Sequence, residues 1–172
     1  NAADARSSAP RIAFIGNGVF IAAWDQTDQT LNQRLSLHAS SFNGQSWLPT
    51  VPLDSGNGNG NGAGGVSLAG NGQGKAVAVW ARIEGGSVSL WSAGFDSSGW
   101  RAPLQVIGPT NLGIRAGPAV AIDASGRSWV AWTLTGGATQ AVEYSELDDR
   151  SNQWTQPVRL STGAMQPTPP AL

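Results

Sequence analysis

Side chains able to carry acid–base or metal chemistry are few in this 172-residue chain, and they are scattered along it. There is one histidine, His38, and no cysteine, so a thiolate zinc site and a cysteine nucleophile are both excluded. Among the acidic residues, Asp25 lies close to Asp28 and Asp148 is next to Asp149, and both pairs are expected in loops. A paired-carboxylate hydrolase needs two acids that face each other across a cleft, and nothing in the spacing makes these acids converge. We therefore predict no catalytic residue, no metal site and no cofactor, and we expect His38 to be a partly exposed strand residue.

A tract rich in glycine and asparagine, DSGNGNGNGAGG, occupies residues 54–65. Successive backbone amides in such a tract can bind an anion, and asparagine carbonyls are suitable calcium ligands. However, the tract lacks the aspartates of the calcium-binding nonapeptide repeat, and no phosphate-binding strand–loop–helix motif surrounds it. We interpret it as a flexible connection, with ion binding by residues 56–62 as the alternative.

The composition excludes several classes of partner. Charged residues make up only 12% of the chain and the net charge is −1, so no basic surface is available to attract nucleic acid. No apolar run approaches the roughly 18 residues of a membrane span, and the polar start NAADARSSAP is not a signal peptide. Abundant glycine and tryptophan with a single lysine is typical of secreted bacterial proteins, which predicts an extracellular, cell-surface or periplasmic location.

Six of the eight tryptophans mark an internal repeat. Trp24, Trp80 and Trp132 end three stretches, 10–24, 66–80 and 118–132, that match one another without a gap. A second series keeps the same spacing, because Trp47, Trp100 and Trp154 open the segments WLPTVPL, WRAPLQV and WTQPVRL. A period of about 50 residues indicates an array of similar supersecondary units.

Each repeat contains four short strand-like runs separated by turn residues such as GNG, NGQG and DASG. No stretch combines a helical apolar period with capping residues. The chain is therefore predicted to be all-β, a β-propeller-type array of four-stranded antiparallel blades, with a repeated sandwich as the main rival. The predicted organisation within one propeller domain is an N-terminal arm (1–9), blade 1 (10–62), blade 2 (63–114), blade 3 (115–166) and the first strand of a fourth blade (167–172).

Three blades cannot form a complete ring, because closed propellers have four to eight blades. An open end would leave an unpaired strand edge and a bare apolar face. We therefore expect further blades as partners, supplied by a longer version of the same chain or by other chains.

From Pro10 to Leu172 the layout resembles the propeller repeats of bacterial secreted proteins, in the style of sialidase-type (BNR, or Asp-box) propellers and propeller lectins. In such blades the motif Ser-x-Asp-x-Gly-x-Thr-Trp occupies the turn between strands three and four, and the best match here is GFDSSGW (94–100). The resemblance implies that Asp96 stabilises a turn.

A sialidase would also need an arginine cluster and a tyrosine that a glutamate activates. Tyr144 lies beside Glu143, which points to the opposite face of a strand, and two residues before Glu146, which can share its face. Arg11 and Arg115 lie near the starts of first strands, and a third matching arginine is missing. A sialidase-like glycoside hydrolase is thus the alternative function, and a purely structural subunit is another.

The favoured function is an extracellular, non-catalytic recognition or assembly module that binds a glycan or a protein through its propeller loops. The repeated tryptophans are expected to pack blade against blade, whereas Trp91 and Trp129 depart from the repeat and are candidate ligand contacts. The loops between second and third strands add the other candidates, which are Asp25, Asp28, Arg82 and Glu84.

Overall fold

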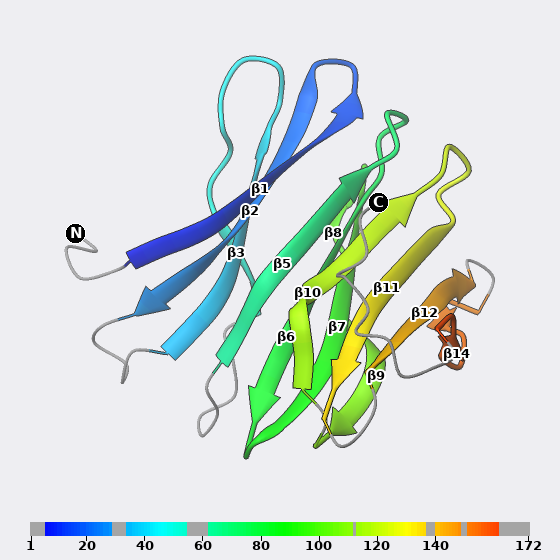
Figure 1. Ribbon diagram of the computed structural model, residues 1–172. Helices are drawn as coiled ribbons and strands as arrows, with labels where there is room; N and C mark the ends of the chain where they lie inside the picture. The colour runs from blue at the N-terminus through cyan, green and yellow to red at the C-terminus, as the bar shows by residue number, and fades with distance from the viewer. Residues whose placement is uncertain are drawn as a thin grey trace.

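Every regular element in the described part of the computed structural model is a β-strand. The structure describes residues 6–28, 34–54, 62–111, 113–136, 140–148 and 151–161. Within these ranges the strands form three antiparallel units, shown side by side in Figure 1 from blue through green to orange. The prediction of an all-β chain with antiparallel sheets is confirmed.

The three units repeat one order of strands. The first unit consists of β1 (Arg6–Gly16), β2 (Val19–Asp28), β3 (Arg34–Phe42) and β4 (Val51–Asp54). The second consists of β5 (Gly62–Gly70), β6 (Ala76–Glu84), β7 (Ser87–Asp96), β8 (Gly99–Trp100) and β9 (Leu104–Thr110). The third consists of β10 (Gly113–Ile122), β11 (Ser128–Thr135), β12 (Ala141–Asp148), β13 (Gln153–Trp154) and β14 (Val158–Arg159).

Turns rich in glycine and short polar residues join the first two strands of each unit. In the first unit, Asn17 adopts a φ of 51° between two glycines, a left-handed conformation that asparagine tolerates. In the second unit, Oδ1 of Asn71 accepts hydrogen bonds from the backbone N–H groups of Gln73 and Lys75. In the third unit, Oδ1 of Asp123 accepts a hydrogen bond from the Ser125 hydroxyl and three more from backbone N–H groups, and these bonds lower the pKa of Asp123. In each repeat, an asparagine or aspartate therefore stabilises the turn between the first two strands.

The first and second units belong to one nine-stranded sheet, but among the described residues a single parallel bridge, Leu35 to Gly62, is the pairing between them. The third unit is a separate five-stranded sheet. The first strand of each unit has a register shift at the same relative place, which is the signature of a β-bulge. The units are therefore held together mainly by the packing of their faces.

Two apolar interfaces join the units. At the first interface, Ala23, Leu37 and Ala39 of the first unit pack against Ala78 and Trp80 of the second. At the second interface, Val77, Val79, Leu90 and Val106 of the second unit pack against Val120, Val130 and Trp132 of the third. Because side chains alternate along a strand, each unit has a front face, which carries Trp24, Trp80 or Trp132, and a back face on the other side. At both interfaces the front face of one unit covers the back face of the preceding unit.

The tryptophans of the front faces differ in burial. Trp80 and Trp132 are both fully buried, because a preceding unit covers each of them. Trp24 is only half-buried, since no preceding unit lies over it in the described part of the chain.

Two features predicted from the sequence fall outside what the structure tests. Residues 55–61 of the glycine and asparagine tract, and residues 167–172 of the expected fourth blade, lie outside the described residues. No helix in the described ranges is long and apolar enough to cross a membrane.

Candidate functional site

A tryptophan stands at the start of the outermost segment of every unit, in the same pairing position. Trp47, Trp100 and Trp154 pair with Phe42, Phe95 and Leu147, respectively. Each pairing partner is on the front face of its unit. Trp100 and Trp154 therefore lie at the two inter-unit interfaces, where they pack against the apolar cores.

Trp154, at the second interface, is hydrogen-bonded to the neighbouring unit. The indole Nε1–H of Trp154 donates a 2.8 Å hydrogen bond to the hydroxyl of Ser92 on β7. Ser92 is buried on the back face of the second unit. The bond thus satisfies the indole N–H across the interface.

The equivalent bond is missing at the first interface. Trp24 pairs with His38 in the first unit, and the equivalent Trp80 pairs with Trp91 in the second. The residues that follow, Ala39 and Ser92, therefore occupy equivalent positions. Alanine offers no side-chain acceptor, so Nε1–H of Trp100 has no hydrogen-bond partner among the described residues.

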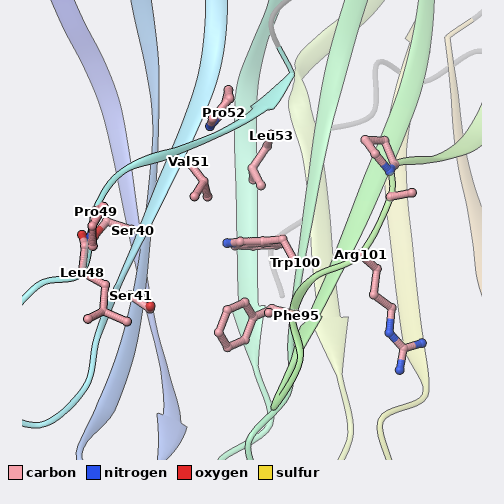
Figure 2. A pocket seen from close by; sticks show the side chains of 13 residues that line it. Ser40, Ser41, Leu48, Pro49, Val51, Pro52, Leu53, Phe95, Trp100 and Arg101 are labelled. Atoms are coloured by element: carbon pink, nitrogen blue, oxygen red, sulfur yellow. The ribbon is translucent and has the colours of Figure 1, made fainter.

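A groove of about 580 Å³ lies at the first interface, next to this free donor. Trp100 and Phe95 form one side, as Figure 2 shows. On the other side, Leu48 and Pro49 come from the segment before β4, and Val51 is the first residue of β4. Its walls are mainly apolar. Of its polar groups, the hydroxyl of Ser40 already donates to the carbonyl of Leu48 at 2.6 Å.

The charged groups near the groove are paired with each other. Arg101 extends away from Trp100 in Figure 2, and its Nε donates to Oδ2 of Asp96 at 2.9 Å. Oδ1 of Asp96 accepts from the backbone N–H of Ser98 at 2.8 Å. The bonds from Ser98 and Arg101 lower the pKa of Asp96, as expected for a carboxylate that stabilises a turn. The groove therefore offers aromatic surface and an indole donor, with no charge directed into it from these two residues.

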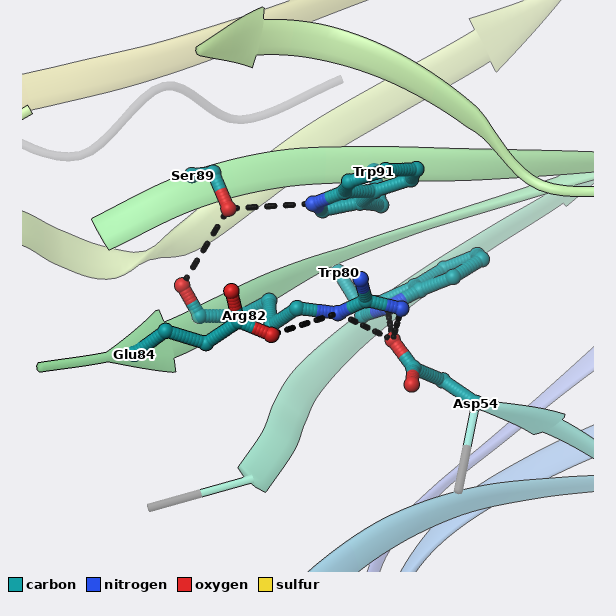
Figure 3. A network of polar contacts seen from close by, with 6 residues as sticks. All are labelled: Asp54, Trp80, Arg82, Glu84, Ser89 and Trp91. Carbon is teal, nitrogen blue, oxygen red and sulfur yellow. Dashed lines mark hydrogen bonds and ion pairs between the residues drawn. The ribbon is translucent and has the colours of Figure 1, made fainter. Parts of the chain in front are cut away.

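A second polar cluster joins three residues predicted from the sequence, Arg82, Glu84 and Trp91 (Figure 3). Oδ2 of Asp54 accepts from Nε1 of Trp80 at 2.6 Å and from Nε and Nη2 of Arg82 at 3.0 and 2.7 Å. The guanidinium lies 4.2 Å from the ring centroid of Trp91, and its Nε is 3.9 Å from Oε1 of Glu84. The cluster fixes the first interface, because Asp54 belongs to the first unit and the other residues to the second.

Asp25, another predicted ligand contact, is buried at the same interface. Its Oδ2 accepts from the backbone N–H of Gly65 at 3.0 Å, and its Oδ1 has no hydrogen-bond partner among the described residues. Burial raises the pKa of Asp25, and the amides of Gly65 and Val66 with the charge of Arg11 offset only part of this effect.

The remaining predicted contacts do not join this cluster. The side chain of Asp28 lies outside the described residues. Trp129 is in the third unit, with the guanidinium of Arg127 at 5.8 Å from its ring. None of the proposed ligand contacts is tested by this geometry, and each stays a prediction.

The groups considered for catalysis have structural partners. Nε2 of His38 lies 2.9 Å from the Ser36 hydroxyl and its ring stacks on Trp24, while burial lowers the His38 pKa. Glu146 pairs with Arg127, and Glu143 with Arg159. Within the described ranges, no three His, Asp or Glu side chains are grouped so that they could hold a metal ion.

Sequence reasoning missed the groove and Asp54. It assigned Trp100 to packing between the units. Trp100 does pack there, and the same side chain also lines the groove. The signal was present in the replacement of Ser92 by Ala39 at the equivalent repeat position, but reading it requires the strand register. No protein-family model matches this chain, and no curated protein matches it significantly.

Proposed function

We propose that this chain is an extracellular, non-catalytic recognition module built from propeller blades, and that it binds an extended segment of a partner protein in the groove beside Trp100. The observation that carries the proposal is the indole N–H of Trp100, which has no hydrogen-bond partner among the described residues and borders a groove of about 580 Å³. The extracellular location rests on the composition of the chain.

The propeller assignment is supported by the way the units repeat. Each unit is an antiparallel run of strands in sequence order, and the front face of each covered unit packs on the back face of the one before. Radial repetition of such four-stranded units around an axis is the architecture of a propeller.

The chemistry of the groove favours a peptide over a glycan. Sugars present many hydroxyl groups, and a sugar site needs several polar side chains to satisfy them. Here the walls are formed largely by Leu48, Pro49, Val51, Phe95 and Trp100. Aromatic-lined grooves bind extended, proline-rich peptides, whose backbone carbonyls accept hydrogen bonds while apolar side chains fill the groove. The indole N–H of Trp100 is a suitable donor to such a carbonyl.

The experiment compares binding of wild type and five variants to arrays of short peptides of varied proline and apolar content and to glycan arrays. Val51→Asp places a charge in the groove wall, and Trp100→Phe removes the indole donor while keeping an aromatic ring. We expect wild type to bind a subset of the peptides, Val51→Asp to abolish this binding, and Trp100→Phe to weaken it about tenfold, the value of one hydrogen bond.

The repeat supplies matched controls. Val158→Asp changes the equivalent exposed valine of the third unit, and Trp154→Phe removes the equivalent indole N–H where Ser92 satisfies it. Both should bind peptides as wild type does. Binding to glycans alone, or peptide binding that survives Val51→Asp but is lost on Arg82→Ala, contradicts the proposal and favours the loop site predicted from the sequence.

A further inference from the structure

A cavity of about 160 Å³ lies between the second and third units, beside the turns that join the first two strands of each. We call it the Lys75 cavity. Its charged and polar lining comes from both units, since Lys75, Asp96 and Arg101 belong to the second unit and Ser128 and Asn152 to the third. Groups that can donate hydrogen bonds therefore line the cavity from two sides.

Two of these donors are hardly used within the protein. Nζ of Lys75 has one hydrogen-bond acceptor among the described residues, the carbonyl of Ser125 at 3.4 Å. Ser128 is only 1% exposed, and its hydroxyl makes a long bond of 3.5 Å to the carbonyl of Gly126. Gly126 also leaves room for the ammonium group, because a Cβ at this position would collide with Nζ of Lys75. The cavity thus holds an ammonium group and a buried hydroxyl that can both bind a further acceptor.

Lys75 and Ser128 depart from the repeat. Lys75 corresponds to Val19 of the first unit, and Ser128 corresponds to Ala76 of the second. Val19 and Ala76 pack together in an apolar cluster at the first interface. Apolar residues therefore suffice to pack two units at this place, and a polar group is costly to bury there unless it is hydrogen-bonded. The polar residues of the second interface are better explained by a bound ligand.

The charges that line the cavity are unequal. Lys75 and Arg101 contribute two positive charges, and Asp96 contributes one negative charge. Hydrogen bonds from Ser98 and Arg101, with a smaller effect from the charge of Lys75, lower the pKa of Asp96, so this carboxyl is ionised at neutral pH. Arg101 is paired with Asp96, which leaves the charge of Lys75 to attract an anion.

We propose that the Lys75 cavity binds a tetrahedral oxyanion, that is, sulfate or phosphate. Lys75 supplies the positive charge, and the hydroxyl of Ser128 with the amide of Asn152 supplies hydrogen bonds from the other unit. A tetrahedral anion directs oxygens toward both sides of the cavity at once, whereas a carboxylate has two oxygens in one plane. The site is independent of the groove beside Trp100, because neither Lys75 nor Ser128 lines that groove.

The test follows the backbone amide NMR signals of isotope-labelled protein while sulfate, phosphate, methyl phosphate or acetate replaces chloride at constant ionic strength. We expect sulfate and phosphate to shift the signals of Lys75, Gly126 and Ser128 to saturation, and acetate to bind more weakly. Methyl phosphate separates two sources of the anion. Binding as tight as that of phosphate assigns the site to an esterified phosphate group, whereas much weaker binding assigns it to the free ion.

The repeat again supplies a matched control. Lys75→Met removes the charge and keeps the length of the side chain, and it should weaken phosphate binding at least tenfold. Arg127→Met removes the cation at the equivalent position of the third unit, which does not line the cavity, and binding should be unchanged. Ser128→Ala restores the residue of the second unit, so it is compatible with the fold, and it should weaken binding about tenfold.

Asp96→Asn gives a change of opposite sign. Asparagine can still accept the bond from Ser98, but the negative charge beside the anion is gone, so phosphate should bind severalfold more tightly. A purely structural role of these residues predicts no such gain. The proposal is overturned if wild type shows no saturable shifts at the cavity, or if acetate binds as tightly as phosphate. It is also overturned if Lys75→Met and Arg127→Met weaken binding equally, since the anion then responds only to the overall surface charge.

Discussion

Trp80 donates its indole N–H to Oδ2 of Asp54 at 2.6 Å, and both side chains are buried between the first and second units. The register pairs Leu37 with Asp54 and Leu90 with Ile107, so Ile107 is the equivalent of Asp54 at the second interface. Accordingly, Nε1 of Trp132 is buried without a hydrogen-bond partner in the described part of the chain. Each interface therefore has one of two possible indole hydrogen bonds. At the first interface the bond runs from Trp80 to Asp54, and at the second it runs from Trp154 to Ser92.

Asp54→Ala is expected to lower the free energy of unfolding by about 3 kcal/mol, since breaking a buried ion pair costs about 3–5 kcal/mol. The substitution leaves the indole of Trp80 and the guanidinium of Arg82 without their shared acceptor, in a site where the Arg82 side chain is 12% exposed. Denaturant unfolding at neutral pH measures the loss. Asp96→Ala is the control, because its partner Arg101 is 58% exposed and exposed pairs contribute at most about 1 kcal/mol. Equal losses in the two variants would contradict a special role for Asp54.

Trp154→Phe is expected to destabilise the protein by about 1 kcal/mol more than Trp100→Phe does. Both variants lose the same ring atoms at equivalent positions, but only Trp154 loses a hydrogen bond, worth about 1 kcal/mol, to Ser92. The difference between the two free energies of unfolding is the quantity to compare. Ser92→Ala should remove most of this difference, because it deprives Trp154 of its acceptor in advance. Equal effects of the two Trp→Phe changes would show that the Ser92 bond contributes nothing.

Gly70→Ala is expected to destabilise the first interface by more than about 2 kcal/mol. The added methyl group would collide with the carbonyl oxygen of Phe14, and backbone on both sides must move to relieve the overlap. Gly108→Ala is the matched control, because nothing lies within 4 Å of its Cβ position and its φ is not left-handed. Gly108→Ala should be neutral or stabilising by about 0.4–1 kcal/mol. Thermal unfolding of both proteins separates steric contact from general glycine effects.

The repeat of tryptophans, with the strand-like runs and turns between them, was enough to predict an all-β chain of similar antiparallel units, because packing imposes the repeat on every unit. Trp80 and Trp132 are buried for the same reason, so they recur at the same position. Strand boundaries followed from turn residues such as Asn17, which tolerates a left-handed φ. What recurs in a repeat is the part of the structure that sequence periodicity reveals.

The candidate groove depends on residues that differ between the repeats. Their effect could not be predicted from the sequence alone. Within the described residues, the indole N–H of Trp100 lacks the acceptor that Ser92 gives Trp154, because alanine stands at the equivalent position 39. The two positions can be matched only through strand pairing. Likewise, Asp54 meets Trp80 only because the back face of the first unit packs on the front face of the second. Contacts between units depend on which faces meet, whereas periodicity describes each unit by itself.

Asp25→Asn is expected to change how stability depends on pH. Burial raises the pKa of Asp25 above its ordinary 3.8, so folding favours the protonated acid. The stabilisation that this gives is complete below pH 3.8 and is lost as the pH rises through the pKa of the folded protein. Asparagine does not titrate. The free energy of unfolding of Asp25→Asn should therefore increase relative to that of wild type as the pH rises above 3.8.

Asp123→Asn provides a control of opposite sign. Hydrogen bonds in its turn lower the pKa of Asp123, so its contribution is present above pH 3.8 and is lost as the pH falls through the lowered pKa. As the pH rises, the free energy of unfolding of wild type should therefore increase relative to that of Asp123→Asn. Relative to that of Asp25→Asn, it should decrease. Unfolding curves of the three proteins between pH 3 and 7 give both differences. If the two differences change in the same direction, the Asp25 carboxylate is not held in a desolvated site between the units.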